Sequence, residues 1–150
     1  MSSSRPASAA ELKTRALRIL ARREHSRQEL ERKLAPFAES PEFLDGLLSE
    51  LESRKLLSNH RFAEQRAHVL SRKYGAAKIR HDLKSKGVEG DIVARVSAEG
   101  ELERARAILA RKYPRPAKTR EELAKRMRFL QGRGFSYETI YQAVQIVDDE

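Results

Sequence analysis

The chain has 150 residues, of which 39% are hydrophobic, 35% charged and 6% aromatic, with no cysteine and a formal net charge of +9. The scarcity of aromatic residues disfavours a β-sandwich or barrel. The absence of cysteine excludes disulfides, thiolate nucleophiles and cysteine-bearing zinc sites. No apolar run approaches the roughly 20 residues needed to cross a bilayer, and no apolar leader follows Met1, so we expect a cytoplasmic protein with no membrane partner.

Residues 1–9 predict a disordered tail, and residues 10–57 predict a first helical repeat. Within it, Ser26 and Glu29 have the spacing of a capping box, and Ser40 precedes a proline at a predicted first helical turn. Apolar residues recur at the helical period of 3.6 in three segments. These residues are Leu12, Ala16, Ile19 and Leu20, then Leu30 and Leu34, then Phe43, Leu47, Leu48 and Leu51.

Residues 58–100 predict a second helical repeat. Its second helix runs into Gly87, which can adopt the left-handed conformation that ends many helices. The apolar positions again follow the helical period. They are Ala63, Ala67, Leu70 and Tyr74, then Ala76, Ile79 and Leu83, then Ile92, Val93 and Val96.

Residues 101–150 predict a third helical repeat. Thr119 and Glu122 form a second predicted capping box, Gly134 a second left-handed C-terminal cap, and Ser136 the cap of the last helix. The predicted buried positions are Leu102, Ala105, Ile108 and Leu109, then Leu123, Met127 and Leu130, then Tyr137, Ile140, Val144 and Val147.

One short motif ends the first helix of each repeat. It reads Leu20-Ala21-Arg22-Arg23-Glu24, Leu70-Ser71-Arg72-Lys73-Tyr74 and Leu109-Ala110-Arg111-Lys112-Tyr113, at intervals of 50 and 39 residues. A basic stretch of this kind is common in helices, but its recurrence at the same place in three units favours repetition. The sequence therefore predicts an all-α fold of three tandem three-helix repeats, stacked because three short helices enclose only a small core.

The positive charge is concentrated toward the C-terminus. Residues 1–57 hold 11 basic and 9 acidic residues, whereas residues 104–133 hold 11 basic residues and only Glu121 and Glu122 as acids. Pairing of basic with acidic side chains on a solvated helix face explains the charges of residues 1–57 well. It explains those of residues 104–133 poorly, because few acids are available there. We therefore expect the basic side chains of the second and third repeats to face DNA phosphates or an acidic protein surface. The candidate residues are Arg72, Lys73, Lys78, Arg80, Arg111, Lys112, Lys125, Arg126 and Arg128.

Tyrosines at helical spacing have two possible roles. Tyr74 and Tyr113 occupy equivalent repeat positions, and Tyr137 and Tyr141 lie in the last predicted helix. Stacking on nucleic acid bases is one role, but packing in the core or between repeats is the more frequent one.

The sequence contains no recognisable catalytic or metal motif. A G-x-x-x-x-G-K-S/T phosphate loop is absent, and the four histidines form no H-E-x-x-H pattern. We therefore expect no enzymatic activity, no catalytic residue, no cofactor and no metal.

Four segments in order carry a resemblance to a known family. The opening segment runs from Ala16 to Leu30, and Leu47-Leu48-Ser49-Glu50-Leu51-Glu52 leads into Leu56-Leu57 and Arg61-Phe62-Ala63. Lys73-Tyr74-Gly75 precedes Lys78-Ile79-Arg80 and Leu83-Lys84-Ser85-Lys86-Gly87-Val88, and Arg128-Phe129-Leu130-Gln131-Gly132-Arg133-Gly134-Phe135-Ser136 follows. Together they resemble the RecX family of regulatory proteins from about residue 10 to residue 147. One departure is Arg54-Lys55-Leu56, where the family pattern has a glycine in place of Lys55.

The resemblance implies an elongated, curved arrangement of the three repeats. It also implies a regulator of the RecA recombinase that binds RecA filaments on single-stranded DNA and mainly inhibits ATP hydrolysis, strand exchange and filament growth. We expect a monomer that spans more than one recombinase subunit. The alternative is a basic helical module that binds DNA without a recombinase partner, with helix-turn-helix-like units.

Overall fold

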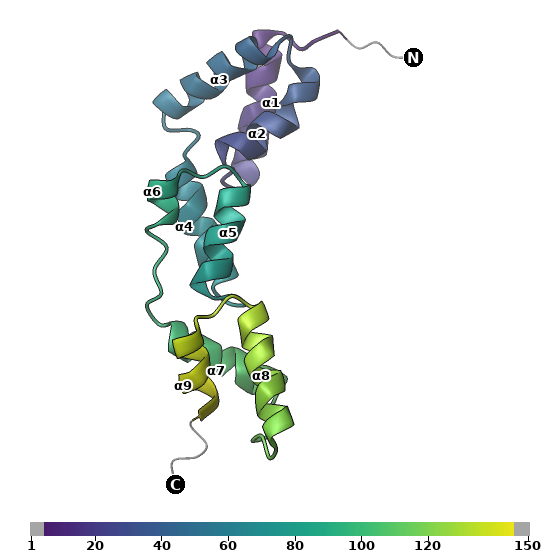
Figure 1. Ribbon diagram of the computed structural model, residues 1–150. Helices are drawn as coiled ribbons and strands as arrows, with labels where there is room; N and C mark the ends of the chain where they lie inside the picture. Colours follow the sequence, from purple (N-terminus) through teal and green to yellow (C-terminus); the bar gives the residue numbers. More distant parts are fainter. Residues whose placement is uncertain (1–4, 146–150) are drawn as a thin grey trace. The chain divides into compact units, whose positions relative to one another are not determined.

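The computed structural model describes residues 5–145, and that range contains helices and no strand. This confirms the all-α prediction; Val147 and the rest of residues 146–150 lie outside the described residues, as do residues 1–4. Figure 1 shows the elements in order. They are α1 (Ala9–Arg22), α2 (Arg27–Leu34), the 3-10 helix η1 (Ala35–Phe37), α3 (Pro41–Ser53), α4 (Asn59–Leu70), α5 (Ala76–Ser85), α6 (Gly90–Val93), α7 (Glu101–Lys112), α8 (Arg120–Gly132) and α9 (Tyr137–Gln145).

The described residues divide into two compact units. Unit 1 comprises residues 5–65 and 84–90, and unit 2 comprises residues 66–83 and 91–145. The boundaries fall inside α4, α5 and α6, so the second predicted repeat contributes residues to both units.

Unit 1 has a core of leucines. The fully buried set is Leu12, Ala16, Leu30, Leu34, Leu48 and Leu51, with Leu44 and Leu57 almost as inaccessible. The six fully buried residues lie on the predicted apolar stripes of α1, α2 and α3, where burial of each leucine contributes about 1.5–3 kcal/mol. Leu44 and Leu57 were not predicted, and the predicted Phe43 and Leu47 are only half-buried. Short helices need such packing, because helices of this length are marginal in isolation.

The predicted helix caps are confirmed. The side chains of Ser26 and Thr119 accept from the backbone N–H three residues on, and Glu29 and Glu122 reach back to close both capping boxes. Ser40 caps α3, and the Ser136 hydroxyl accepts from the N–H of Thr139. A further capping box, between Ser8 and Glu11, begins α1 at Ala9, inside the segment that the sequence predicts as tail.

Two elements differ from the sequence prediction. The loop expected after Leu34 contains η1, which begins beside Pro36. The third helix of the second repeat is only the four-residue α6, and Val96, expected on its stripe, lies beyond its end. The chain leaves the helix after Val93, Arg80 donates to the carbonyl of Val96 at 2.7 Å, and α7 begins at Glu101 after the left-handed Gly100 (φ 73°).

Unit 2 has its core where α7, α8 and α9 meet. Ala105 and Leu130 are fully buried, and Ile108, Leu109, Phe135, Ile140, Ala143 and Val144 pack with them. Leu123 and Met127 pack against this cluster from α8, as predicted. The prediction that Tyr137 is buried is wrong: its side chain is 71% exposed at the first position of α9, and it stacks on the exposed Tyr141. The spacing of apolar residues predicts which face of a helix is buried. It does not predict how far along that face the neighbouring helix extends.

Candidate functional site

All nine predicted basic residues lie in unit 2. Arg72 and Lys73 follow α4, and Lys78 and Arg80 lie in α5. Arg111 and Lys112 form the last turn of α7, where cations complement the negative end of the helix dipole. Lys125, Arg126 and Arg128 lie in α8.

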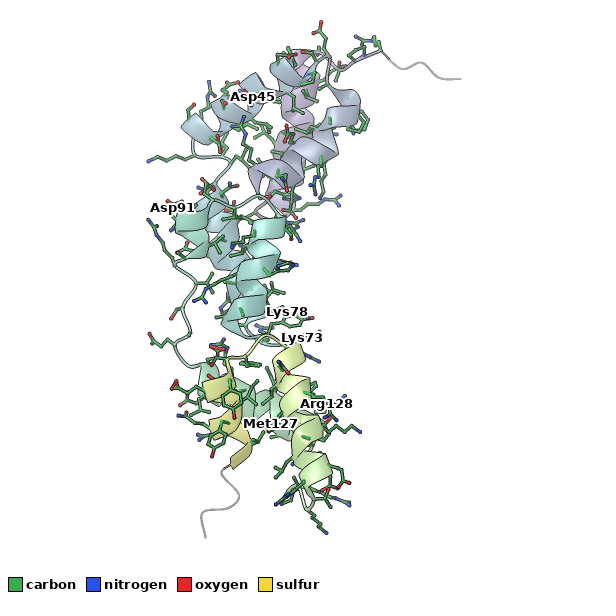
Figure 2. The ribbon with its side chains drawn as sticks, viewed as in Figure 1. Asp45, Lys73, Lys78, Asp91, Met127 and Arg128 are labelled. Atoms are coloured by element: carbon green, nitrogen blue, oxygen red, sulfur yellow. The ribbon has the colours of Figure 1, made fainter. Side chains whose placement is uncertain are left out.

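Five of these side chains point into solvent, and we call them the free cations: Arg72, Lys73, Arg111, Lys125 and Arg128. Among the described residues, none of their side chains makes a hydrogen bond or an ion pair. Figure 2 shows Arg128 on the outward side of α8, away from Met127, which lies toward α9. Cations that are already solvated and unpaired can contact phosphate without breaking an internal interaction.

Three other predicted residues belong to a cluster of cations and aromatic rings. Lys112 lies 5.2 Å from the centroid of the Phe129 ring, Arg126 lies 4.7 Å from that of Tyr113, and Lys78 lies 5.2 Å from that of Tyr74. Tyr113 and Phe129 pack edge to face with centroids 5.9 Å apart. Each such contact is worth about 0.5–1 kcal/mol at an exposed site and restricts where the charge can lie.

Arg133 joins the two parts of this cluster, and the sequence did not place it among the candidates. Its guanidinium lies 4.9 Å from the Phe129 ring and 5.5 Å from the Tyr74 ring, and it donates to the carbonyl of Lys73 at 3.1 Å. The sequence did contain one signal for this cluster, because Tyr74 and Tyr113 occupy equivalent repeat positions. In the structure a cation lies over each of these two rings.

The turn after α4 packs against the turn after α8. The N–H of Gly75 donates to the carbonyl of Arg133 at 2.7 Å, and the Lys78 ammonium donates to the carbonyl of Gly132 at 3.0 Å. Gly134 has a φ of 89°, and a Cβ there would lie 2.4 Å from the Cβ of Lys78. Figure 2 shows Lys73 and Lys78 together at this place. The close backbone approach therefore sets the position of both lysines.

Arg80 and Arg126, like Lys78, also donate hydrogen bonds to backbone carbonyls. The half-buried Arg80 donates to the carbonyl of Val96 at 2.7 Å and so holds the segment after α6. Arg126 donates to the carbonyl of Arg115 at 2.7 Å. Arg104, outside the predicted set, donates to the carbonyls of Ser71 and Glu99.

Two acids of this region are engaged in local structure. Asp82 pairs with Arg66 at 2.9 Å. The N–H of Lys118 is the main donor that lowers the pKa of Glu122, with the Thr119 N–H assisting against the smaller opposing effect of burial. Glu122 is therefore an anion committed to the start of α8. The described part of unit 2 thus presents a surface with an excess of unpaired positive charge.

The described residues offer no sign of other chemistry. They contain no cluster of three or more His, Cys, Asp or Glu side chains able to hold a metal ion. Among them, no helix has both the length and the apolar character that a membrane span requires.

Comparisons with known proteins agree with the repeat pattern. Models described as the second and third three-helix domains of RecX match residues 58–96 and 99–144. The regulatory protein RecX of Herbaspirillum seropedicae is 45% identical over 137 residues, covering 89% of each chain. That of Ralstonia nicotianae is 43% identical over 140 residues, covering 91% of this chain and 88% of the relative. The crystal structure of RecX from Lactobacillus salivarius has the same fold, with a TM-score of 0.79 at 22% identity over 93% of this chain and 96% of that chain. The tandem helical repeats and the resemblance are therefore confirmed, and the chain belongs to the RecX family of regulatory proteins.

Proposed function

We propose that this chain is a non-enzymatic regulator of the RecA recombinase that binds RecA and its filament on single-stranded DNA. In this proposal it restrains ATP hydrolysis, strand exchange and filament growth. Membership of the RecX family is the observation that carries the proposal. The unpaired positive charge of unit 2 supports its polyanion-binding part.

The nine predicted basic residues have three roles in this proposal. The free cations make the long-range electrostatic contacts with DNA phosphates or acidic recombinase surface. Lys78, Lys112 and Arg126, held over aromatic rings, supply charge at defined positions. Arg80 acts mainly by holding the segment after α6.

In this proposal the tandem repeats allow one chain to contact several binding sites along a filament. We propose three repeats at residues 10–57, 58–100 and 101–150, acting as a monomer that contacts successive recombinase subunits. When one repeat binds, the others are held at high effective concentration near their own sites, so modest contacts combine into strong binding. Such a regulator acts at amounts far below those that cover the DNA.

The test is the single-strand-dependent ATPase of RecA from the same organism, measured as this chain is added at fixed DNA. We expect inhibition well before the chain is abundant enough to cover the strand. Inhibition that rises only in proportion to DNA coverage would instead support a DNA-binding module without a recombinase partner. Turnover of nucleotide by the chain alone would contradict the non-enzymatic assignment.

A charge-matched pair of variants localises the effect. Arg111→Gln/Lys125→Gln/Arg128→Gln removes three free cations of unit 2, and Arg32→Gln/Arg54→Gln/Lys84→Gln removes three exposed cations of unit 1. We expect the first variant to need at least tenfold more protein for half inhibition and the second to behave like the unaltered chain. Equal loss in both would show that net charge, and not this surface, determines inhibition.

A further inference from the structure

Unit 1 contains a cavity of about 1250 Å3 beside α1, the end of α2 and η1. Six cations line it: Arg5, Arg15, Arg18, Arg22, Arg23 and Lys33. Glu11 is the only acid among the described residues that line it. Figure 1 shows α1 and α2 side by side at this end of the unit. The sequence predicts no function here, because the charges of the first repeat are nearly balanced in number.

Although basic and acidic residues are nearly equal in number, several acids of unit 1 pair with cations that do not line the cavity. Arg27 binds both Asp45 and Glu52, and Glu50 pairs with Lys13 and Arg54. Glu24 pairs with Arg61 at 2.8 Å. These four carboxylates therefore neutralise cations outside the cavity and leave the cavity beside α1 with six cations and one acid.

The cations of the cavity differ in whether they have an internal ion-pair or hydrogen-bond partner. Arg23 is held by Glu29 at 3.2 Å, and the exposed Arg5 lies 3.8 Å from Glu11. Arg18 and Arg22 are exposed, and neither makes a side-chain hydrogen bond or ion pair among the described residues. They lie one helical turn apart, so both can contact one chain of phosphates.

The cavity also has an aromatic edge. The guanidinium of Arg15 lies 3.9 Å from the centroid of the Phe37 ring, and Phe37 is 38% exposed. Arg15, Arg18 and Arg22 follow the i, i+3, i+7 spacing of one helix face over about 10 Å. Their positive charges therefore lie along one side of α1, where the backbone of a single strand can follow them.

We propose that this cavity is a second nucleic acid site, which binds a single strand through its phosphates at Arg18 and Arg22 and through a base at Phe37. An array of arginines beside an exposed aromatic ring is the combination that single-strand binders use, whereas an acidic peptide has no group that requires the ring. The chain then has polyanion-binding surfaces in both units. The proposal concerns direct binding by this chain alone, so it can succeed or fail whether or not RecA is the partner.

The test uses the full chain and a fluorescent oligothymidylate of about 12 nucleotides, within the usual size of single-strand sites. The background variant Arg111→Gln/Lys125→Gln/Arg128→Gln weakens the unit 2 surface. In that background we expect Arg18→Gln/Arg22→Gln to weaken binding at least tenfold. The slope of log affinity against log salt should become shallower by about 1.4, which corresponds to 0.7 for each lost phosphate contact.

The matched control is Arg32→Gln/Arg54→Gln in the same background. It removes two exposed arginines of unit 1 that do not line the cavity. We expect its salt slope to be unchanged. Equal slopes for the two variants overturn the proposal, and circular dichroism of each variant verifies that the helices are intact.

A third variant tests the base contact. Phe37→Leu keeps an apolar side chain but removes the ring, and we expect at least fivefold weaker binding of oligothymidylate and no change for an abasic strand of equal length. Equal losses on both strands overturn the stacking part. If Arg18→Gln/Arg22→Gln weakens binding of polyglutamate but not of oligothymidylate, the occupant is an acidic peptide and the proposal is wrong.

Discussion

At the scale of single residues, Lys55 stands where the family pattern has a glycine, and its backbone conformation shows the consequence. Lys55, two residues after the end of α3, has a φ of 62°, and Gly87 and Gly134, two residues after α5 and α8, have φ of 81° and 89°. Lys55 therefore has the left-handed backbone conformation that glycine adopts after those two helices. The turn keeps its geometry, with the N–H of Leu56 donating to the carbonyl of Leu51 at 2.9 Å, so the lysine bears the strain.

Relief of that strain is testable. We expect Lys55→Gly to stabilise unit 1 by about 0.5–1 kcal/mol. The left-handed conformation costs a residue with a Cβ about 1–2 kcal/mol, and glycine removes this cost. Part of the gain is lost because glycine gives the unfolded chain more conformational entropy. Lys55→Ala is the control, since it removes the same charge and keeps the Cβ, and it should leave stability within about 0.5 kcal/mol of the unaltered chain. Urea unfolding followed by circular dichroism measures both. Equal stabilisation by the two variants would assign the effect to charge.

At the scale of elements, the start of α2 connects the parts of unit 1. The Ser26 hydroxyl accepts from the N–H of Glu29 and donates to the carbonyl of Lys86 at 2.7 Å. His25 is buried beside it and lies between the carbonyl of Arg23 and the ammonium of Lys33. A neutral imidazole satisfies both neighbours, because Nδ1–H donates to the carbonyl and Nε2 accepts from the lysine.

This arrangement predicts a loss of stability in mild acid. Burial lowers the pKa of His25 below its ordinary value of 6.5, with the charges of Arg23 and Lys33 acting in the same direction and the Arg23 carbonyl opposing them. Below pH 6.5 the unfolded chain therefore binds a proton on this imidazole that the folded chain does not, and stability falls as the pH falls. Urea midpoints at about pH 7.5 and about pH 5.5 measure the fall.

The control is a second histidine. We expect His25→Gln to remove the change in stability over this interval, whereas His81→Gln, at an exposed position of α5, should retain it. An unchanged pH dependence in His25→Gln would contradict the assignment. A second loss follows at lower pH from Glu29: burial raises its pKa, but the Arg23 and Ser26 hydrogen bonds outweigh burial and keep it below 4.5.

The sequence predicts local structure better than it predicts how distant residues meet. Caps such as Thr119 and left-handed glycines such as Gly134 depend on neighbours within four residues, and both predictions are confirmed. Arg133 and Phe37 were missed because their partners, Tyr74 and Arg15, are far away along the chain. The short α6 was missed because its end depends partly on Arg80, which holds Val96 from another helix.

At the scale of the whole molecule, charge and apolar surface are distributed so that no large apolar area is left exposed. In the described residues the exposed large apolar side chains are Leu17, Phe37, Leu56, Val69, Tyr137 and Tyr141. They belong to α1, η1, the turn after α3, α4 and α9, and only the two tyrosines stack on each other. Scattered apolar residues of this kind are ordinary on a monomer surface.

A monomer is therefore the expected state in solution. Copies that each carry a net charge of +9 repel one another, and residues 5–145 expose only scattered apolar side chains to oppose that repulsion. Sedimentation equilibrium at about 0.15 M salt should give 17.2 kDa at all accessible concentrations. If twice that mass appears, Tyr137→Ser/Tyr141→Ser identifies its origin: return to 17.2 kDa would assign self-association to the α9 tyrosines, and the prediction of a monomer would be wrong. A monomer leaves every repeat free for its partner, which the proposed multivalent contact with successive recombinase subunits requires.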